Sequence, residues 1–417
     1  MKELLTTLGH TAKECAQTLA QASNIQKNKA LLAIAVTLNT QAKSILTANQ
    51  KDITIAQEKG RNNAFIDRLR LSEKSITAMT NAIDEVVKLD DPVGKTLAHW
   101  QRPNGLKIEK ISVPLGVIGI IFESRPNVTA DAACLCLKSG NAAILRAGSE
   151  SFHSASVIMN CIQQGLIQAD LPKGCVQLIP TQDRQAVTEM LHLDKFIDVI
   201  IPRGGKSLIQ HVSQESRIPV FKHLDGICHT YIHKEADIDM ANEIVFNAKM
   251  RRPGICGATE TLLIDTCIVN SHLPKIIDQL IAAQCEVRGD ALVTSLDKRI
   301  KPAISEDWDS EYLDNIISIK TVNDIDEAIA HIQQHGSQHT DAIISNDNNA
   351  AEKFFRYIDS AIVMHNTSTQ FADGGEFGLG AEIGIATGKL HARGPVGIEQ
   401  LTTYKYIVRG GGQVRAL

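Results

Sequence analysis

The segment of residues 247–257, NAKMRRPGICG, contains the residue types best suited to chemistry. Cys256 follows a Pro-Gly turn and has three cations, Lys249, Arg251 and Arg252, within seven residues. Neighbouring cations stabilise a thiolate, which is the nucleophilic form of cysteine. A turn rich in glycine also lets a substrate approach the backbone closely. The segment indicates a cysteine nucleophile, against the plain alternative of a small buried hydrophobic side chain.

A second candidate is the segment Arg203-Gly204-Gly205-Lys206-Ser207, which follows an apolar run and opens a helical stretch. Backbone N–H groups at the start of a helix bind phosphate. A P-loop also ends in Gly-Lys-Ser, but it needs a glycine five residues before Gly205, where this chain has Ile200. A P-loop is therefore excluded, and a phosphate-binding turn and an ordinary glycine turn both stay open.

Other motifs give weak signals. Residues 378–384, GLGAEIG, miss the GxGxxG pattern because the last glycine comes one residue late. The fourteen histidines show no HExxH spacing, and the nine cysteines include no CxxC pair. We expect no metal and no disulfide, and such cysteines suit a reducing cytoplasm.

The elements that must position these residues fall into blocks. Residues 1 to about 90 predict several amphipathic helices. Apolar runs of strand length then alternate with helical stretches, which predicts a parallel sheet covered on both faces, with ligands at the carboxyl ends of its strands. The expected strands are 116–122, 142–145, 176–179 and 199–201, and the expected helices are 128–138, 150–168 and 183–191.

A second alternating block follows a predicted domain boundary near Asp225-Gly226. Residues 100–110, with Pro103-Asn104-Gly105 between alternating stretches, predict a β-hairpin. The strands expected in the second block are 230–232, 261–264, 342–345 and 361–364, and the helices are 237–250, 271–284 and 323–335.

The composition suits a protein of two or three domains with large buried cores. The chain has 417 residues, of which 43% are hydrophobic and 22% are charged. Its formal net charge of −4 gives no general attraction to nucleic acid or to an anionic membrane. We see neither a signal-peptide core nor a run of 18 apolar residues. Nucleic-acid and membrane partners are therefore not expected.

Four long motifs, in the right order, resemble the aldehyde dehydrogenase superfamily over nearly the whole chain, and most closely its family of γ-glutamyl phosphate reductases. They are residues 114–129 (PLGVIGIIFESRPNVT), 249–260 (KMRRPGICGATE), 371–382 (FADGGEFGLGAE) and 390–406 (LHARGPVGIEQLTTYKY).

The resemblance implies an α/β, aldehyde dehydrogenase-like fold of three parts. A Rossmann-like cofactor domain would comprise residues 1–98 and 112–225, and an α/β catalytic domain would comprise residues 226–390. A small β-flap for oligomerisation, residues 99–111 and 395–417, would combine the hairpin with a C-terminal strand near 401–408. The family forms dimers or tetramers through this flap, so a homo-oligomer is expected.

The resemblance also implies roles for single residues. Cys256 stands in the place of the nucleophile. Arg146 to Ser149 match the stretch that holds the adenosine ribose, and Arg203 to Lys206 match the helix start that faces the pyrophosphate. Glu311 matches the glutamate that holds the nicotinamide ribose, although its neighbours depart from the usual EIFGP. Ser149 replaces a carboxylate of NAD-dependent relatives and Arg146 adds a cation, so the expected cofactor is NADPH/NADP⁺.

Two departures from the superfamily pattern concern the chemistry. The usual ELGG segment, whose glutamate activates water, is here His223-Leu-Asp225-Gly226. Arg125 stands in the place of the oxyanion asparagine, with Asn127 two residues on, and which donor serves the oxyanion stays open. The polar segment 365–370, which includes Ser368, is expected to bind the α-carboxylate and amine of the substrate.

The implied reaction is the reduction of γ-glutamyl phosphate to glutamate 5-semialdehyde and phosphate, a step of proline biosynthesis, through a Cys256 thioacyl enzyme. Lys249, Arg251 and Arg252 would attract the leaving phosphate, unless they are only a solvated helix end. Glutamate 5-kinase is an implied partner for channelling.

Two rival functions stay open. Another enzyme of the superfamily would make a free acid or a CoA thioester, and the missing glutamate argues against the free acid. A catalytically inactive structural or redox-sensing relative is the second rival, and the intact cysteine turn argues against it.

Overall fold

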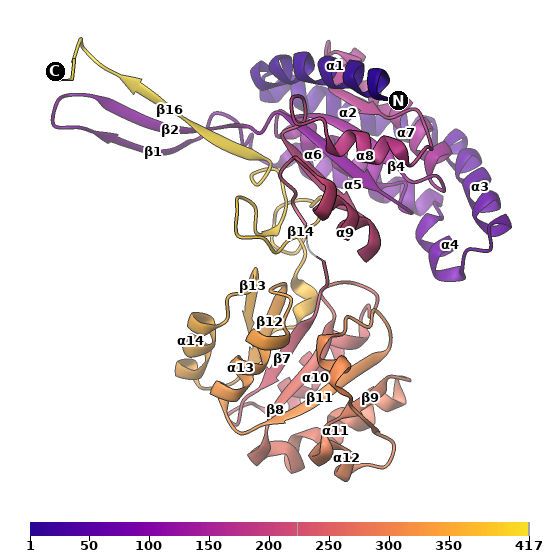
Figure 1. The fold of residues 1–417 in the computed structure, drawn as a ribbon, viewed down its shortest axis with the longest axis vertical. Helices are drawn as coiled ribbons and strands as arrows, with labels where there is room; N and C mark the ends of the chain where they lie inside the picture. Colours follow the sequence, from indigo (N-terminus) through magenta and orange to yellow (C-terminus); the bar gives the residue numbers. More distant parts are fainter. Residues whose placement is uncertain (223, 416–417) are drawn as a thin grey trace. The chain divides into compact units, whose positions relative to one another are not determined.

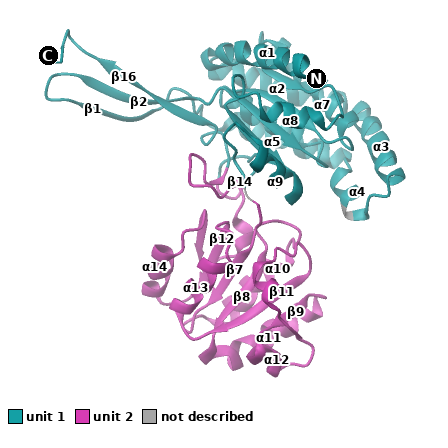
Figure 2. Ribbon diagram, in the orientation of Figure 1, with its two compact units in different colours: residues 1–222, 378–384, 396–417 teal, residues 223–377, 385–395 magenta. Residues whose placement is uncertain are grey.

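The computed structural model describes residues 1–222 and 224–415, and the chain divides into two compact units (Figures 1 and 2). Unit 1 comprises residues 1–222, 378–384 and 396–417, and unit 2 comprises residues 223–377 and 385–395. Residues 378–384 thus lie with unit 1, although they fall inside the range 226–390 expected for the catalytic domain. They do so because their glycines pack on unit 1 side chains, with Gly380 against Leu89 and Gly384 against Arg203.

The core of unit 1 is a parallel four-stranded sheet in the order β5-β4-β3-β6. Strands β3 (Val117–Phe122) and β4 (Ala142–Ala147) are buried at every residue, as expected for a parallel sheet covered on both faces. They are flanked by β5 (Val176–Leu178) and β6 (Val199–Arg203). Because β4 and β6 lie on opposite sides of β3, the carboxyl ends of β3 and β6 form the switch point at which such sheets bind ligands.

Helices pack around this sheet (Figure 1). Helices α7 and α2 pack closely, because a Cβ on Gly165 of α7 would lie 2.5 Å from the Ile34 side chain of α2. The helices are α1 (Lys2–Gln21), α2 (Asn24–Thr40), α3 (Ala42–Glu58), α4 (Asn63–Leu69), α5 (Glu73–Lys88), α6 (Val128–Lys138), α7 (Phe152–Gln168), α8 (Gln185–Leu191) and α9 (Lys206–Glu215). In the described chain, no single helix is long and apolar enough to cross a membrane, and only the bent pair α2–α3 passes by length and composition.

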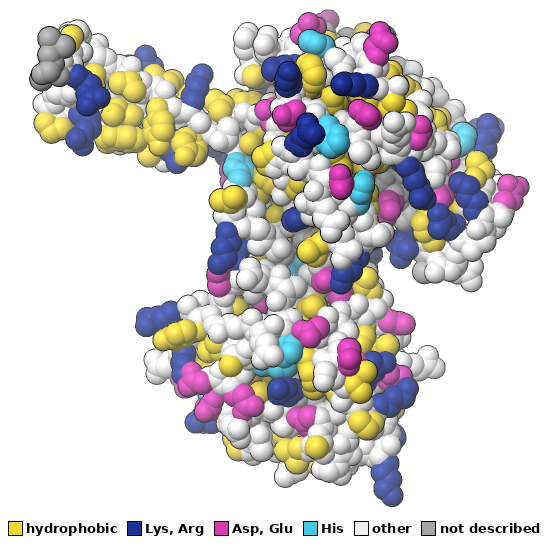
Figure 3. All heavy atoms as spheres, in the orientation of Figure 1, with side chains coloured by type: hydrophobic (Ala, Val, Ile, Leu, Met, Phe, Trp, Pro, Cys, Tyr) yellow, Lys and Arg dark blue, Asp and Glu magenta, His cyan; other side chains and the backbone are white. Residues whose placement is uncertain are grey.

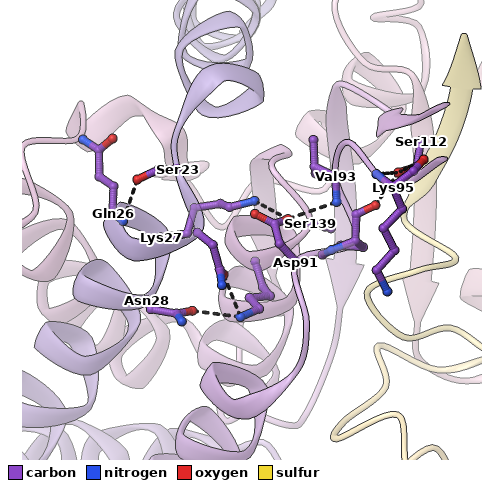
Figure 4. Close-up of polar contacts among 12 residues, drawn as sticks. Ser23, Gln26, Lys27, Asn28, Asp91, Val93, Lys95, Ser112 and Ser139 are labelled. Carbon is purple, nitrogen blue, oxygen red and sulfur yellow. Dashed lines mark hydrogen bonds and ion pairs between the residues drawn. The ribbon is translucent and has the colours of Figure 1, made fainter.

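Two buried lysines fasten α2 and α6 to neighbouring chain (Figure 4). Lys27 of α2 donates to Asp91 Oδ1 at 2.7 Å, and the same oxygen accepts the N–H of Val93 at 3.0 Å. Lys138 of α6 donates to the Asn28 side chain at 2.8 Å. A buried ammonium group is costly unless it is paired. The Lys27 contact therefore fixes the segment that leads from α5 to the next strand, and the Lys138 contact holds α6 to α2.

A separate three-stranded antiparallel sheet, the flap, extends from unit 1 as an arm (Figure 1). Strands β1 (Thr96–Gln101) and β2 (Lys107–Pro114) form the predicted hairpin, with Gly105 at φ +89° in the turn. Strand β16 (Thr402–Arg409) pairs with β2 along its whole length.

Unit 2 is built on a parallel seven-stranded sheet in the order β10-β9-β11-β8-β7-β12-β13. Alternate residues enter two cores, with Leu262 and Ile264 on one face and Tyr231 and Leu263 on the other. The strands are β7 (Cys228–Ile232), β8 (Thr259–Asp265), β9 (Glu286–Gly289), β10 (Lys301–Pro302), β11 (Ile316–Val322), β12 (Thr340–Ile344) and β13 (Ile362–His365). The helices are α10 (Ile238–Met250), α11 (Val269–Ala282), α12 (Ala291–Leu296), α13 (Ile325–His335) and α14 (Asn348–Tyr357).

The structure confirms every predicted strand and helix of the two blocks within a few residues. It adds elements that the sequence pattern did not predict, namely β9, β10, β11, α12 and α14. Two short strands, β14 (Ile385–Ala386) and β15 (Gly394–Pro395), pair with each other near the C-terminus.

Candidate active site

Cys256 lies half-buried in the turn that joins α10 to β8. The N–H of Ala258 donates to the carbonyl of Ile255 at 3.0 Å and closes this turn. Because the turn precedes β8, Cys256 lies at the amino end of that strand. This position follows because α10 returns the chain to that edge of the sheet, and the expectation of ligands at carboxyl ends concerned the first sheet, not this one.

Gly226 and Cys228, just before and at the start of β7, contact the backbone of Cys256. The Cys228 thiol donates to the Cys256 carbonyl at 3.0 Å, and burial raises the pKa of that thiol well above its usual value, so it keeps its proton. A Cβ on Gly226 would lie 2.2 Å from the Cys256 oxygen and 2.7 Å from its Cα. Glycine is therefore required at position 226 for the backbone of Cys256 to lie where it does.

Lys249 does not face the solvent, although it is one of the three cations predicted beside Cys256. Its side chain is fully buried, and its Nζ lies 2.5 Å from Oε2 of the equally buried Glu260. Burial raises the pKa of Glu260 to about 7, and Lys249 opposes this shift. The other carboxylate oxygen accepts the N–H of Leu313 at 3.2 Å. Only Arg251 and Arg252 are exposed cations next to the turn.

The short helix η4 (Thr369–Phe371) packs directly on the turn. A Cβ on Gly257 would lie 3.1 Å from the carbonyl oxygen of Thr369. The Thr369 hydroxyl is 3.0 Å from that of Thr259 at the start of β8. Gln370 Nε2 donates to the carbonyl of Ala248 at 3.0 Å and joins η4 to the last turn of α10.

A cavity of about 330 Å³ is lined by residues of α10, of η4 and of the loops next to η4, all within unit 2. It includes two of the predicted substrate residues, Arg251 and Ser368. The sequence analysis missed Glu243 and Asn247, which precede Arg251 by eight and four residues on one face of α10. The lining residues are Glu243, Ile244, Asn247, Arg251, Asn366, Thr367, Ser368, Gln370, Phe371 and Glu376.

The predicted pyrophosphate segment lies in unit 1, at the switch point of its sheet. Arg203 ends β6, and Gly205 is the N-cap of α9, which begins at Lys206. The N–H of Gly205 donates to a carboxylate oxygen of Glu123 at 2.7 Å. The Glu123 carboxylate therefore occupies this N–H, and a phosphate oxygen would have to replace it at the helix start. A Cβ on Gly204 would lie 2.5 Å from the same carboxylate, so the loop has no room for a side chain there.

Arg146 is not an exposed cation. It is 5% exposed, and its guanidinium donates to the backbone carbonyls of Ala147, Gln182 and Asp183. Burial, and to a smaller degree the nearby Arg184, lower the pKa of Arg146. Backbone carbonyls occupy both Nη groups, while Nε is buried without a hydrogen-bond partner, so the role of Arg146 as a cation for a phosphate stays a prediction.

Ser149, the other residue of that prediction, is half-buried, and its hydroxyl donates to Glu150 at 2.6 Å. Arg184 is exposed beside this stretch.

The remaining predicted site residues are divided between the units. Arg125 and Asn127 precede α6 in unit 1, and the Asn127 amide donates to Asp131 at 2.8 Å. Burial raises the pKa of Asp131 to about 6. Glu311 lies in unit 2, close enough to Glu260 to raise the pKa of that residue further. The matching position for the water-activating base, His223, lies outside the described residues. The oxyanion donor thus stays a prediction.

Comparisons with known proteins agree with this fold. The model of the aldehyde dehydrogenase family matches residues 5–297. A γ-glutamyl phosphate reductase from Paramagnetospirillum magneticum is 56% identical over 412 residues, covering 99% of this chain and 97% of the relative. The crystal structure of a γ-glutamyl phosphate reductase from Thermotoga maritima superposes with a TM-score of 0.97 at 42% identity, covering 99% of this chain and 100% of that one.

More distant structures share the fold alone. An engineered glycolyl-CoA reductase with bound NADP⁺ superposes with a TM-score of 0.67 at 15% identity, and each chain is covered to 96%. The family match and the identities lead to one conclusion. The chain belongs to the aldehyde dehydrogenase family and, within it, to the γ-glutamyl phosphate reductases.

The close approach of Gly226 to Cys256 gives the first prediction. Gly226→Ala should lower kcat by at least ten-fold, because the new Cβ would push the Cys256 backbone away by contact with its carbonyl. Steady-state kinetics should be measured together with the rate of iodoacetamide alkylation of Cys256. That rate should change as well, since the thiol would leave its present surroundings.

Gly254→Ala is the matched control in the same turn. A Cβ at position 254 meets only the Leu313 oxygen at 3.7 Å, an ordinary contact. If both variants kept the kinetics of the unmodified protein, the contact beneath Cys256 would have no role in positioning the thiol.

Proposed function

We propose that the protein reduces γ-glutamyl phosphate to glutamate 5-semialdehyde and phosphate with NADPH, the second step of proline biosynthesis from glutamate. The main support is the Cys256 turn. It presents a half-buried cysteine beside two exposed arginines, in a chain that is 56% identical to a protein named for this reaction.

The chemistry of Cys256 follows from its position in the turn. The thiolate attacks the γ-carbonyl carbon, and the bond to the phosphate oxygen breaks, which leaves a thioacyl group on Cys256. Arg252 attracts the dianionic phosphate by charge. Backbone N–H groups of the turn, with Arg125 or Asn127 as the side-chain donor, stabilise the oxyanion. When bound, the nicotinamide cofactor supplies the hydride that releases the aldehyde.

The residues that would hold the cofactor pyrophosphate are those at the switch point of the unit 1 sheet. By its resemblance to the family, Glu311 is the proposed partner of the nicotinamide ribose. The N–H groups at the start of α9, from Gly204 to Lys206, suit the pyrophosphate because they lie at a helix N-terminus, where the pyrophosphate would replace the Glu123 carboxylate. The preference for NADPH is supported by the neutral Ser149 and by the exposed Arg184, rather than by the buried Arg146.

The flap is the proposed surface for homo-oligomers. Hydrophobic side chains gather on its exposed face in Figure 3. Leu97, Tyr404, Tyr406 and Val408 are each about half exposed, at 47–55%. An exposed apolar patch on strands of this kind is typical of a protein interface. Glutamate 5-kinase is the proposed channelling partner in a reducing cytoplasm.

Cys256→Ala should abolish turnover, because no acyl group can form on alanine, while cofactor binding survives. Turnover and NADPH fluorescence titrations measure the two effects. Iodoacetamide should modify Cys256 faster than the buried cysteines and more slowly when substrate is present. Full activity in the alanine variant would exclude a thioacyl mechanism.

Ser149→Glu should shift the preference from NADPH toward NADH. A carboxylate there would repel a 2′-phosphate, and charged hydrogen bonds are worth about 1.5–3 kcal/mol, roughly ten-fold to over a hundred-fold in kcat/KM. Ser149→Gln is the neutral control of the same size. Equal use of both cofactors by the unmodified enzyme would contradict the assignment.

The reverse reaction, oxidation of glutamate 5-semialdehyde with NADP⁺, should require inorganic phosphate or arsenate. A thioester hydrolyses quickly only with a positioned base, which contributes about 10²- to 10⁴-fold. The glutamate that supplies this base in free-acid-forming relatives is replaced by His223 in this sequence. NADP⁺ reduction should therefore stop in phosphate-free buffer, and His223→Glu should raise the phosphate-independent rate. If glutamate formed steadily without phosphate, water and not phosphate would be the acceptor of the acyl group.

A further inference from the structure

The charged side chains that line the cavity next to η4 complement the two charges of an α-amino acid. Its lining contains one cation, Arg251, and two carboxylates, Glu243 and Glu376. Within the described parts of the chain, none of these three side chains makes an ion pair or a hydrogen bond with its charged group. An α-amino acid head group carries one negative and one positive charge, so it complements this lining.

The charged residues of α10 lie on one face of the helix. Glu243, Asn247 and Arg251 are spaced by four residues, so their side chains project in the same direction. At a rise of about 1.5 Å per residue, the Cα atoms of Glu243 and Arg251 are roughly 12 Å apart. Two long side chains at that separation can converge on a small ligand between them, with the Asn247 amide in the middle.

Gln370 supplies a buried acceptor in the same lining. Its side chain is 4% exposed, and Nε2 donates to the backbone carbonyl of Ala248 at 3.0 Å. A carbonyl can only accept, so this contact fixes which end of the amide is nitrogen. The oxygen Oε1 is buried and has no hydrogen-bond partner. A buried acceptor without a donor is costly, and an ammonium ligand would satisfy it.

The cavity also lies next to the turn of the reactive cysteine. Thr369 of η4 contacts Gly257 and Thr259, and Gln370 and Phe371 of the same helix line the cavity. One short helix thus contacts both the Cys256 turn and the cavity.

We propose that this cavity binds the α-amino acid head group of the substrate. Arg251 pairs with the α-carboxylate, and the oxygens of Gln370, Glu243 and Glu376 accept from the α-ammonium. The inference rests on the proposed function, because it assigns the remote end of the same substrate. It gives Arg251 a role in selecting the substrate instead of attracting the leaving phosphate, which leaves Arg252 as the exposed arginine for that task.

Three aldehydes separate the two charges of the head group. Glutamate 5-semialdehyde has both, 5-oxopentanoate has only the carboxylate, and 4-aminobutanal has only the ammonium group. Each is oxidised with NADP⁺ at saturating phosphate, and kcat/KM is compared among the unmodified enzyme, Arg251→Met and the double variant Glu243→Gln/Glu376→Gln. All three altered side chains are exposed, which favours correct folding, and thermal unfolding and NADP⁺ binding verify it.

The proposal predicts a crossed pattern. Arg251→Met should lower kcat/KM roughly ten- to a hundred-fold for the two substrates with a carboxylate and leave 4-aminobutanal unchanged. The double variant should lower it for the two substrates with an ammonium group and leave 5-oxopentanoate unchanged. Arg356→Met, an exposed arginine on α14 outside the cavity, is the matched control and should change none of the three.

Two results would overturn the assignment. If Arg251→Met lowered kcat/KM equally for all three aldehydes, or raised the KM for phosphate, Arg251 would bind the phosphate and not the α-carboxylate. Unchanged selectivity in both variants would place the head group elsewhere. If the unmodified enzyme failed to oxidise glutamate 5-semialdehyde with phosphate, the proposed function itself would fail, which is a distinct outcome.

Discussion

The ion pair between Lys249 and Glu260 is the contact on which the geometry of the candidate active site depends. The two residues lie at the end of α10 and in the second position of β8, so their contact closes the chain segment that contains Cys256. Removing two charges from water costs several kcal/mol per ion, which a close contact and further hydrogen bonds must offset. Glu260 obtains a further bond from Leu313, so the same carboxylate also anchors the loop before β11. With Lys249 turned inward, Arg251 and Arg252 are the cations that remain outside.

In both units, buried polar side chains form contacts that hold helices and loops which the hydrogen bonds of the parallel sheet do not reach. In unit 1, Lys27 ties α2 to the chain before the flap, and Lys138 ties α6 to α2. In unit 2, the buried hydroxyl of Tyr231 donates to Asp265 at 2.6 Å, at the end of β8. Such pairs are satisfied on both sides, so they hold loops on a rigid scaffold without leaving unpaired charge in the core. Loops held in this way are where binding and catalytic residues usually lie.

The sequence predicted those features that depend on local pattern. Apolar runs identified β3, β4, β7 and β8, and the flap hairpin followed from its turn residues. Strands β9 and β10 escaped because their segments, Glu286–Gly289 and Lys301–Pro302, are short and polar, and their pairing comes from neighbours in the sheet. In β11, Ser318 and Lys320 interrupt the apolar run.

The candidate site was predictable only where one segment defines it. Cys256 was predicted from the residues of its own turn. The burial of Lys249 could not be predicted in this way, because it depends on Glu260, which is buried in β8. A Glu inside the apolar segment TETLLID was the available signal for that partner. The cavity brings α10 together with residues more than a hundred positions later, so no local spacing revealed it. The backbone contacts that occupy Arg146 come from a loop about 36 residues away along the chain and were equally hidden.

The pairing of β16 with β2 has a consequence for biosynthesis. Thr402 lies opposite Pro114, and at about 5–20 residues per second the ribosome needs on the order of 15–60 s to make the roughly 290 residues between them. During that interval the flap hairpin has left the ribosome with an unpaired edge, and exposed strand edges are where nascent chains associate wrongly. Residues 223–377 of unit 2 are synthesised in the meantime and can complete their own sheet first. Strand β16 therefore completes a sheet whose other two strands emerged long before it, so the synthesis of β16 sets the time at which the flap can form.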